Sequence, residues 1–490
     1  MANLWTIDAI VEAVSGNLIE QDTGVERDSS TISVTGVSID SRTLESGDLF
    51  VALKGEHADG HDYLAKAFDN GAEAALVTDI RAGEIPANKS CIKVQDTLQA
   101  LEQLGKASRA RTPARVVAIT GSAGKTSTTR ALKRALDAYG KTHSSIKSYN
   151  NMFGVPLSLA RMPETAEFGI FEIGMNHSGE ITPLSNMVRP HVVVITNVEP
   201  VHIGYFENIE GIAHAKAEIF SGLPETGTAV LNRDNTQFAL LKSLAEKRGV
   251  KIMTFGESPQ AECRLVSMEP APDATQVTLQ ICTGGQRSEQ HTYRIGAPGK
   301  HLVMTSLAVA AVVHCLGLPL AAALATFADY VVPEGRGVRR SLQCGDGRIT
   351  LIDESYNANP VSMRAALATV FQIPSENQQR RIAVLGDMLE LGRHSIEYHQ
   401  ELKAPLEESD VDLVFACGPH MSHLYQDLAP AMRGAYAETA EQLGPLLVDA
   451  LRAGDIVMLK GSLGSRIGSI VKSVFERYPV IVEKEKKTED

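Results

Sequence analysis

Residues 120–126 read Thr-Gly-Ser-Ala-Gly-Lys-Thr, and their types and spacing are those of a loop that binds phosphate. Glycines permit tight turns that bring backbone N–H groups to an anion, the lysine supplies a charge for the outer phosphates, and the last threonine offers a hydroxyl to Mg²⁺. The spacing is shorter than the common G-x-x-x-x-G-K-[ST] because Ile119 stands where the first glycine would be. The alternative is a glycine-rich turn with an exposed lysine. An apolar run before the loop and a helical pattern after it favour nucleotide binding by Gly121, Ser122, Ala123, Gly124, Lys125, Thr126 and Ser127.

Three further residues could serve a metal ion near this loop. Glu172 lies near the carboxyl end of the apolar run 168–174, where a carboxylate costs several kcal/mol unless it has a partner. A structural ion pair would also explain it, but a doubly wound topology directs it toward Lys125, which favours a metal ligand. His202 follows the next apolar run, and its position alone does not decide between a ligand and a structural histidine. From the residues alone, Lys216 is an exposed helix lysine.

Polar clusters occur in two other parts of the chain. Asp40, Ser41 and Arg42 could bind a phosphorylated substrate, or could form a surface turn with a capping serine. A second cluster directly follows an apolar run, which is typical of a binding loop, and comprises Asp353, Glu354, Tyr356, Asn357 and Asn359. Two other apolar runs end in polar residues that should lie at the same sheet edge, namely Asp387, Lys460 and Arg466.

The elements that must position these residues are readable from hydrophobic patterns. Runs 115–120, 168–174 and 191–198 are continuously apolar, as parallel strands buried on both faces are, and helical patterns at 158–164 and 207–223 separate them. This alternation predicts a doubly wound sheet with ligands at the carboxyl ends of its strands. Runs 263–270 and 275–282 suggest an antiparallel addition, and 301–318 a closing helix. Before this unit, strands at 46–53 and 75–79 flank a helix at 63–74, and a helix at 98–115 follows. After it, strands at 348–355, 381–388, 411–418 and 455–462, with a helical pattern at 395–410, form a second α/β unit.

Length and composition agree with this division. The 490 residues fit about three domains, which we place at 1–110, 111–331 and 332–482, with a charged tail at 483–490. Hydrophobic residues make up 43% and charged residues 22%, which argues against wholesale disorder. The net charge of −12 argues against nucleic acid or an anionic membrane as a bulk partner, although a local cationic pocket remains possible.

The chain shows no sign of export or membrane insertion. No apolar run reaches the roughly 18 residues of a membrane span, and the acidic N-terminal segment lacks the basic region of a signal peptide. The six cysteines never form CxxC, so we expect reduced thiols and a cytoplasmic protein without integral membrane association.

Taken together, these segments resemble the Mur ligases of peptidoglycan synthesis. The resemblance covers nearly the whole chain in order, through DSRTLESGDLFVALKGEHADGHDY, ITGSAGKTSTT, YNNMFGVPLSL, FEIGMNHSGEI, TNVEPVHIGYF, AKAEIFSGLP, LNRDN, IDESYNANPVSM, VLGDMLELG and LKGSLGSR. The pair YNANPVSM and LGDMLELG is the most specific. It is similar to the family member that joins D-alanyl-D-alanine to UDP-N-acetylmuramoyl-tripeptide.

The resemblance implies a fold and a reaction. The fold is a three-domain α/β architecture, with a UDP-sugar-peptide domain, a central ATP-binding P-loop domain with a doubly wound sheet, and a Rossmann-like C-terminal domain that closes over the site. The reaction uses ATP and two Mg²⁺ ions, forms an acyl phosphate, and releases phosphate when the dipeptide amine attacks. The resemblance also implies a cytoplasmic monomer that makes cell-wall precursors needed for cell shape and division.

The resemblance also assigns residues. Thr126 and Glu172 would contact Mg²⁺, His202 a second metal ion, and Lys216 matches the lysine that is carbamylated in the family, which reverses the interpretation from the residue alone. The residues near the nucleotide would be Asn232, Asp234, His301, Arg336 and Asp353. Those near the substrates would be Asn357, Asn359 and Asp387 for the dipeptide, Asp40, Ser41 and Arg42 for UDP, and Asn150 and Asn151 for the sugar peptide.

One position departs from the family pattern. Thr305 stands where the family's G-x-H-x-x-x-N segment has asparagine, so one hydroxyl replaces an amide donor and a carbonyl acceptor near the base. The alternatives are a sibling Mur ligase or folylpolyglutamate-type ligase, a P-loop kinase or ATPase, and a nucleotide-binding module without catalysis. Retention of Lys125, Thr126, Glu172, His202 and Lys216 disfavours the last.

Overall fold

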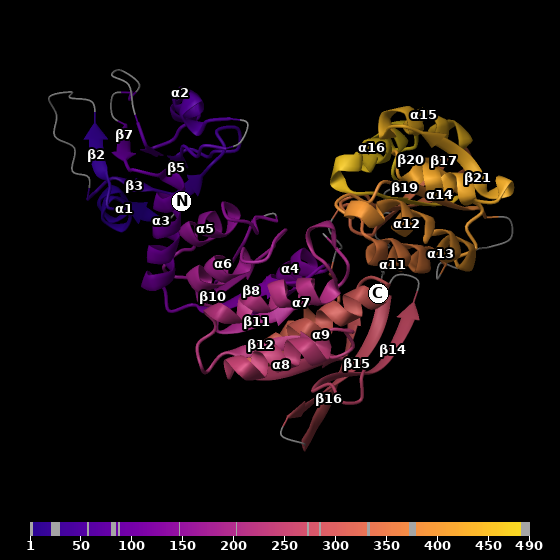
Figure 1. Ribbon diagram of the computed structural model, residues 1–490, viewed down its shortest axis with the longest axis horizontal. Helices are drawn as coiled ribbons and strands as arrows, with labels where there is room; N and C mark the ends of the chain where they lie inside the picture. The colour runs from indigo at the N-terminus through magenta and orange to yellow at the C-terminus, as the bar shows by residue number, and fades with distance from the viewer. Residues whose placement is uncertain are drawn as a thin grey trace, which may run out of the picture.

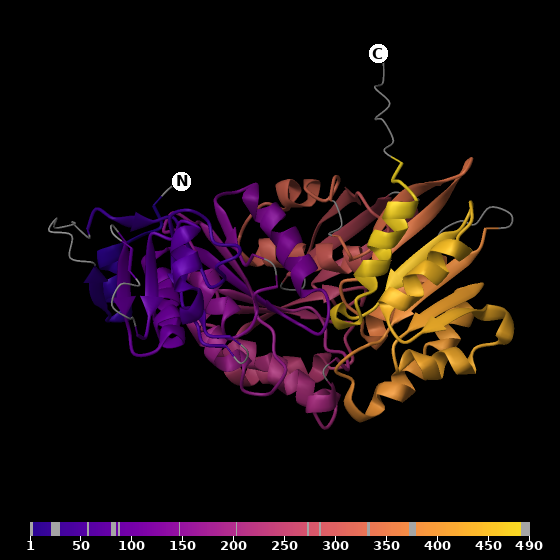
Figure 2. The same cartoon turned by 90° about the horizontal axis from the view of Figure 1, so that it is seen from above.

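Three main sheets, one in each third of the chain, organise the computed structural model. Figures 1 and 2 show the three units side by side in chain order, with the central unit between the other two. The described residues are 3–20, 30–55, 58–79, 85–86, 89–146, 148–201, 203–271, 274–283, 286–330, 334–371 and 379–481. His202, the boundary between 331 and 332, and the tail 483–490 lie outside them.

The first unit is a five-stranded sheet in the order β2-β7-β6-β5-β4, together with an antiparallel pair of β1 and β3. The sheet is parallel except at its β2 edge. The strands predicted at 46–53 and 75–79, and a helix between them, are confirmed. The elements are β1 (Trp5–Thr6), α1 (Ile7–Val14), β2 (Asn17–Glu20), β3 (Ser33–Val34), β4 (Gly36–Ser38), β5 (Asp48–Val51), η1 (Gly60–Tyr63), α2 (Leu64–Asp69), β6 (Ala74–Val77), β7 (Ser90–Lys93) and α3 (Thr97–Arg111).

The central unit is a nine-stranded sheet in the order β16-β15-β14-β13-β12-β11-β8-β10-β9. Strands β9 to β13 and β8 are parallel, and β14, β15 and β16 extend from them as an antiparallel meander (Figure 1). The first part of its elements is β8 (Arg115–Thr120), α4 (Lys125–Asp137), β9 (Thr142–Ser144), α5 (Gly154–Ala160), β10 (Phe168–Glu172), α6 (Ile181–Val188), β11 (Val192–Ile195), η2 (Ile203–Tyr205) and α7 (Ile209–Ala217). The second part is η3 (Glu218–Gly222), β12 (Thr228–Asn232), α8 (Phe238–Arg248), β13 (Lys251–Gly256), β14 (Cys263–Ala271), β15 (Ala274–Thr283), β16 (Gln286–Ile295), α9 (Lys300–Cys315) and α10 (Leu320–Ala325).

The continuous apolar run of β8 is explained by burial on both faces. Val117 and Ile119 belong to a hydrophobic core shared with α4 and α9. Val116 and Ala118 point to the opposite core, which α5, α6, α7 and α8 complete. Successive side chains of a strand alternate between faces, so a strand covered by helices on both sides must be apolar throughout. The doubly wound prediction for this unit is confirmed.

The third unit is a six-stranded sheet in the order β17-β18-β22-β19-β20-β21, antiparallel only at β17. The four predicted strands correspond to β18, β19, β20 and β22. The edge strands β17 and β21 were not predicted. The elements are β17 (Val338–Cys344), β18 (Gly347–Glu354), α11 (Pro360–Phe371), β19 (Arg381–Gly386), η4 (Gly392–His394), α12 (Ser395–Gln400), α13 (Lys403–Glu408), β20 (Leu413–Cys417), α14 (Met421–Asp427), η5 (Pro430–Met432), β21 (Arg433–Ala437), α15 (Ala440–Ala450), β22 (Ile456–Lys460), η6 (Leu463–Ser465) and α16 (Ile467–Arg477).

Proline accounts for three differences between the predicted and the observed helices. The pattern at 395–410 forms two short helices, α12 and α13, because Pro405 has no N–H for the carbonyl of Glu401 and its ring would clash there. Helix α3 ends at Arg111 and α5 at Ala160, each shortly before a proline. The residue before proline disfavours helical dihedrals, so neither helix extends through its predicted range.

The first and central units share a buried junction around Trp5, the only tryptophan in the sequence. Its ring is 4% exposed and packs with Leu157 and Ala160 of α5 in one hydrophobic core. The indole Nε1 donates a hydrogen bond of 2.9 Å to the carbonyl oxygen of Ala160, and the Arg111 guanidinium lies 3.4 Å from the ring centre. Among the described residues, the two hydrophobic cores of the third unit contain no residue of the central unit. The third unit therefore meets the central one through polar and loop contacts.

The structure bears on two expectations from the sequence, the absence of membrane-spanning helices and the reduced state of the cysteines. In the part of the chain that the structure describes, no helix combines the length and apolar character needed to cross a membrane. All six cysteines lie among the described residues and are free thiols, three of them buried.

Candidate active site

The predicted phosphate loop connects the end of β8 to the start of α4. Gly124 has φ of +81°, a conformation that side chains disfavour, and Lys125 directly begins the helix. Gly121 lies so close to Thr196, the residue after β11, that a Cβ atom on Gly121 would be 1.9 Å from Thr196 Oγ1. The N-terminus of a 13-residue helix presents unpaired N–H groups and a positive dipole end, which suits an anion.

Residues that follow β11 hold this loop in shape. Ile195 pairs with Thr120 in the sheet, so Thr196 and Asn197 emerge beside the loop. Thr196 Oγ1 donates to the Ala123 carbonyl oxygen at 2.6 Å, and Asn197 Oδ1 accepts from the Ala123 N–H at 2.8 Å. These bonds fix the loop before any phosphate arrives, which lowers the entropy cost of binding.

Lys125 lies across the loop. Its Nζ donates to the Gly121 carbonyl oxygen at 2.8 Å. Burial lowers the pKa of Lys125, and the nearby Glu172 carboxylate opposes that change. The ammonium group is thus poorly solvated by water and close to the loop, so a phosphate would be a strong partner for it.

Thr126, Glu172 and Asn150 form a hydrogen-bonded cluster beside the loop. Glu172, which is 1% exposed, pairs with Ile119 at the carboxyl end of the sheet. Its Oε2 accepts from Thr126 Oγ1 at 2.8 Å, and its Oε1 accepts from Asn150 Nδ2 at 2.7 Å. The predicted direction of Glu172 is therefore correct, and its buried carboxylate is paired by neutral donors.

This cluster fits a magnesium ion by its chemistry. Thr126 and Glu172 offer hard oxygen ligands, and Mg²⁺ is usually held by one or two such groups together with water and substrate phosphates. No cluster of three or more His, Cys, Asp or Glu side chains that could hold a metal is found within the described ranges.

Lys216 is not the exposed lysine that the sequence alone suggests. It lies on α7 and is 3% exposed. Burial lowers its pKa well below the ordinary value, and the positive charge of Lys125 adds to the effect. Glu218, two residues further along the chain, accepts hydrogen bonds from the backbone N–H groups of Gly179, Ile181 and Thr182 at the start of α6.

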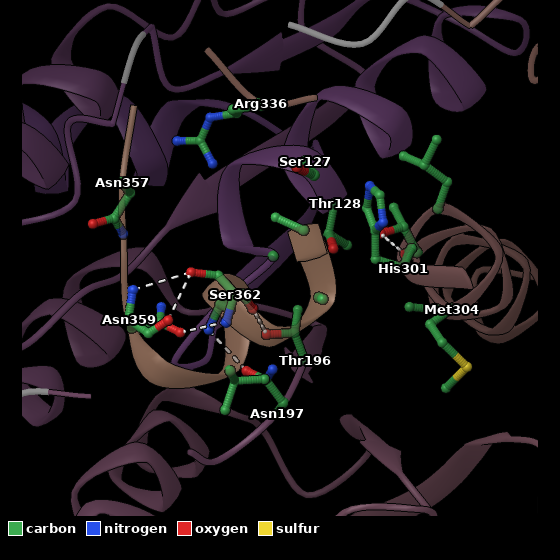
Figure 3. A pocket seen from close by; sticks show the side chains of 18 of the residues that line it. Ser127, Thr128, Thr196, Asn197, His301, Met304, Arg336, Asn357, Asn359 and Ser362 are labelled. Carbon is green, nitrogen blue, oxygen red and sulfur yellow. Dashed lines mark hydrogen bonds between the residues drawn. The ribbon is translucent and has the colours of Figure 1, made fainter. Parts of the chain in front are cut away.

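A cavity of about 310 Å³ lies between the phosphate loop and the third unit. The central unit contributes loop residues, the ends of β11 to β13 and the first turns of α9, while the third unit contributes α11 and residues near the ends of β18 and β22. Figure 3 shows His301 and Met304 on one side of this space, and Asn357, Asn359 and Ser362 on the other. Its size suits a small organic ligand.

The polar loop after β18 contributes directly to the cavity. Asn357 and Asn359 both line it, and Asn359 Oδ1 also accepts from the Ser362 N–H at 2.8 Å, which caps α11. Glu354 and Lys460 pair in register on adjacent strands, with Lys460 Nζ 3.1 Å from Glu354 Oε2. Of the three residues predicted to share this sheet edge, Lys460 lies here beside the loop after β18. Arg466 is exposed and instead lies 3.4 Å from Glu441.

His301 and Thr305 lie on the first turns of α9 and line the opposite wall. Burial lowers the pKa of His301, so its ring is neutral near pH 7. Thr305 Oγ1 donates to the His301 carbonyl oxygen at 2.9 Å. The Thr305 hydroxyl proton is thus engaged within the helix. Only the oxygen lone pairs remain, and they could accept a hydrogen bond from a nucleotide base.

Arg336 brings the third unit to the phosphate loop. Its guanidinium Nη2 lies 3.4 Å from Thr126 Oγ1 and stacks 4.2 Å from the ring centre of Tyr356. Asn232 also lines the cavity. Asp234 and Asp353 are outside the lining, where their carboxylates accept backbone N–H bonds from Glu257 and Gly335 respectively.

The residues expected at the UDP end lie in the first unit, apart from the cavity. Asp40 accepts two bonds from the Arg42 guanidinium, at 2.8 and 2.9 Å, and Arg42 is largely exposed. Ser41 is buried, and its carbonyl accepts from Asn70. Asn151 caps α5 by accepting from the Gly154 N–H at 3.0 Å.

Asp387 occupies a structural position. It is 4% exposed, and its carboxylate accepts from the backbone N–H groups of Met421 at 2.8 Å and His420 at 3.3 Å. These bonds satisfy donors at the start of α14 that the helix itself leaves unpaired. Its carboxylate oxygens are therefore already engaged.

We expect Asp387→Ala to lower the free energy of unfolding by about 1–2 kcal/mol, because it removes a helix-capping carboxylate. Urea unfolding, with Asp427→Ala as the exposed control on the same helix, measures this difference. Unchanged stability together with weaker substrate binding would instead show that Asp387 acts on the dipeptide.

Sequence reasoning missed several side chains of the site. Thr196 and Asn197 follow an apolar strand, so position at a strand end was a usable signal. Ser148, whose Oγ lies 3.2 Å from Thr126 Oγ1, follows only the short strand β9 and gave no such signal. Phe255 lines the cavity as an ordinary strand residue.

Comparison with known families divides the chain as the three sheets do. Residues 33–109 match the model described as the Mur ligase family, catalytic domain. Residues 119–313 match the Mur ligase middle domain, and residues 339–463 match the Mur ligase, glutamate ligase domain.

Whole proteins match over nearly their full length. The UDP-N-acetylmuramoyl-tripeptide–D-alanyl-D-alanine ligase of Rickettsia prowazekii is 31% identical, over 90% of this chain and 96% of its own. The enzyme of the same name from Bacillus subtilis is 32% identical, over 96% and 98%. The crystal structure of MurF from Acinetobacter baumannii superposes with a TM-score of 0.82 at 29% identity, over 97% of this chain and 100% of its own. This likeness confirms the expected three-domain α/β architecture. With these matches along all three units, the chain belongs to the Mur ligase family.

Proposed function

We propose that this protein is an ATP-dependent ligase that joins D-alanyl-D-alanine to UDP-N-acetylmuramoyl-tripeptide, with formation of a C–N bond, in peptidoglycan precursor synthesis. The observation that carries the proposal is a cavity that two units line together. The phosphate loop of the central unit and Asn357 and Asn359 of the third unit face the same space. Relatives of nearly equal length that bear this activity in their names support the choice of substrates.

The reaction would proceed in two steps. A carboxylate oxygen of the tripeptide attacks the γ-phosphorus of ATP, the bond to ADP breaks, and an acyl phosphate forms. The amine nitrogen of the dipeptide then attacks the acyl carbon, phosphate leaves, and the nitrogen loses a proton to solvent. Both reactants of the first step are anions, so positive groups must offset their repulsion.

The residues of the site fit that need. Lys125, Arg336 and the N-terminus of α4 place positive charge around the loop. Thr126 and Glu172 would hold one Mg²⁺, and His202 with Lys216 would serve a second. When bound, magnesium neutralises charge on phosphate oxygens. The chain itself forms no covalent bond to substrate, so its contribution is to position the reactants and stabilise charge.

We further propose that Lys216 is carbamylated. The amine nitrogen would attack the carbon of CO₂ and lose a proton, which changes a cation into an anion with two oxygen ligands. Only a neutral amine can make that attack. The lowered pKa of the buried Lys216 supports this step, because it increases the neutral fraction near pH 7.

The division of labour follows the three units. We assign UDP-sugar-peptide binding to residues 1–110, ATP binding to 111–331 and a Rossmann-like closing domain to 332–482, followed by the tail. The matched family ranges fall within these limits, which supports them. We propose a monomer that acts in the cytoplasm without a nucleic-acid partner.

The test is an assay of purified protein with UDP-N-acetylmuramoyl-tripeptide, ATP, Mg²⁺ and D-alanyl-D-alanine, with the product identified by mass. We expect the dipeptide-extended product, with ADP and phosphate in equal amounts, only when both substrates are present. A stable phosphorylated product without the amine would instead show a kinase. A product formed only with a single amino acid would show a sibling ligase.

A further inference from the structure

Tyr356, which has no part in the function proposed above, reaches from the third unit to the central one. Its hydroxyl oxygen lies 3.2 Å from Ser148 Oγ. Ser148 Oγ lies 3.2 Å from Thr126 Oγ1, which in turn donates to Glu172 Oε2 at 2.8 Å. Three hydroxyl groups therefore form a continuous chain from the third unit to the carboxylate beside the phosphate loop.

The direction of this chain follows from the chemistry of its end. An ionised carboxylate only accepts hydrogen bonds, so the single proton of Thr126 is directed to Glu172. The Thr126 oxygen, which also accepts from Arg336 Nη2 at 3.4 Å, can then act only as an acceptor toward Ser148. Ser148 donates its proton to Thr126 and therefore accepts from Tyr356. The order of donation is thus Tyr356, Ser148, Thr126 and Glu172, and the phenol is the group that starts it.

The position of the phenol is set by the segment that links the central and third units. The Tyr356 N–H donates to the Gly335 carbonyl oxygen at 3.0 Å, and the Arg336 guanidinium stacks 4.2 Å from the ring centre. Gly335 has φ of +72°, and a Cβ atom there would come within 3.0 Å of the Tyr356 Cβ. Tyr356 can therefore reach Ser148 only when the third unit lies against the central unit as it does here.

We propose that Tyr356 and Ser148 are positioning residues that fix the Thr126 oxygen against Glu172 when the third unit is docked. Thr126 and Glu172 would then have the geometry that binds magnesium only when the third unit lies against the central unit. Docking of the third unit would in this way be coupled to metal binding. The inference rests on the proposed function, because that function assigns Thr126 and Glu172 to the magnesium nucleotide. Tyr356 and Ser148 act through Thr126 and Glu172, so they are positioning residues and not catalytic ones.

Calorimetry of ADP binding tests this with magnesium and, separately, with EDTA. Tyr356→Phe removes the hydroxyl but keeps the ring on Arg336, and Ser148→Ala removes the middle link. We expect either variant to weaken binding in magnesium by about three- to tenfold, the usual range for one hydrogen bond, with little change in EDTA. The double variant should be no weaker than either single one, because both break the same chain. Tyr425→Phe, in α14 of the third unit, should match the wild type.

A second measurement separates positioning from simple loss of structure. The half-saturating Mg²⁺ concentration in turnover should rise in Tyr356→Phe, while its thermal midpoint should stay that of the wild type. Wild-type binding by Tyr356→Phe, additive losses in the double variant, or an equal loss in EDTA would each overturn the proposal. Absence of ligase product from the wild-type protein would contradict the proposed function instead, and calorimetry would still test the hydroxyl chain.

Discussion

Replacing Lys125 with alanine is expected to lower turnover by at least about 100-fold, the usual scale for losing one preorganised charged group at a reacting centre. Its Nζ lies across the phosphate loop, where it donates to the Gly121 carbonyl oxygen at 2.8 Å. The loss should appear in kcat, because the charge acts on the transferring phosphoryl group. Release of phosphate under saturating substrates measures it.

Lys133→Ala provides the matched control on the same helix. Lys133 is partly exposed and pairs with Asp137 four residues later, an interaction that contributes little to stability. It should therefore keep wild-type turnover, and circular dichroism should show that both variants are folded. Near-normal turnover of Lys125→Ala would contradict the assignment of the phosphate loop.

Replacing Lys216 with alanine is expected to cause a comparably large loss, about 100-fold, because it would remove a metal-binding carbamate. Short carboxylates such as acetate or formate should restore part of the activity, since they can place oxygen atoms in the vacated space. Lys242→Ala on α8, which removes an exposed lysine paired with Glu246, is the control. This variant should keep wild-type activity, both with and without the added carboxylate. Full activity of Lys216→Ala without added carboxylate would restore the interpretation of a structural lysine.

The pH dependence of the wild-type protein gives a second view of Lys216. Burial lowers its pKa, so the neutral amine persists to lower pH than in an ordinary lysine, and protonation as pH falls through that lowered pKa stops carbamate formation. In buffer depleted of CO₂, activity should therefore fall at the acidic end. Added bicarbonate should recover it in the wild type.

The sheet positions of the central unit could be predicted because burial on both faces leaves a strong pattern. Continuous apolar runs identified β8, β10 and β11, and parallel topology then placed Glu172 beside the loop, as the pairing of Glu172 with Ile119 shows. The hydrogen bonds of Glu172 to Thr126 and Asn150 follow from that geometry. The apolar pattern of the strands and the fold class were therefore sufficient to predict the position of Glu172.

Other features depend on packing that one sequence does not reveal. Lys216 has the spacing of a solvent-facing helix residue, and only the fold turns it toward Lys125. A polar residue after a strand can serve either to bind a ligand or to cap a helix, since both roles need a carboxylate or amide at the same place. Asn357 lines the cavity, whereas Asp387 and Asn151 are caps, and composition alone did not separate them. The assignment of these residues to substrates stays a prediction.

The junction around Trp5 gives the unlabelled protein an optical reporter of a single boundary. Indole emission depends on solvent exposure and on nearby charges, and this ring is enclosed between a guanidinium and the Ala160 carbonyl. No second tryptophan in the chain contributes to the signal. Ligand-dependent emission would therefore report rearrangement where the first unit meets the central one. Docking of the third unit would leave the spectrum unchanged, so fluorescence titration and X-ray scattering together would resolve the two motions.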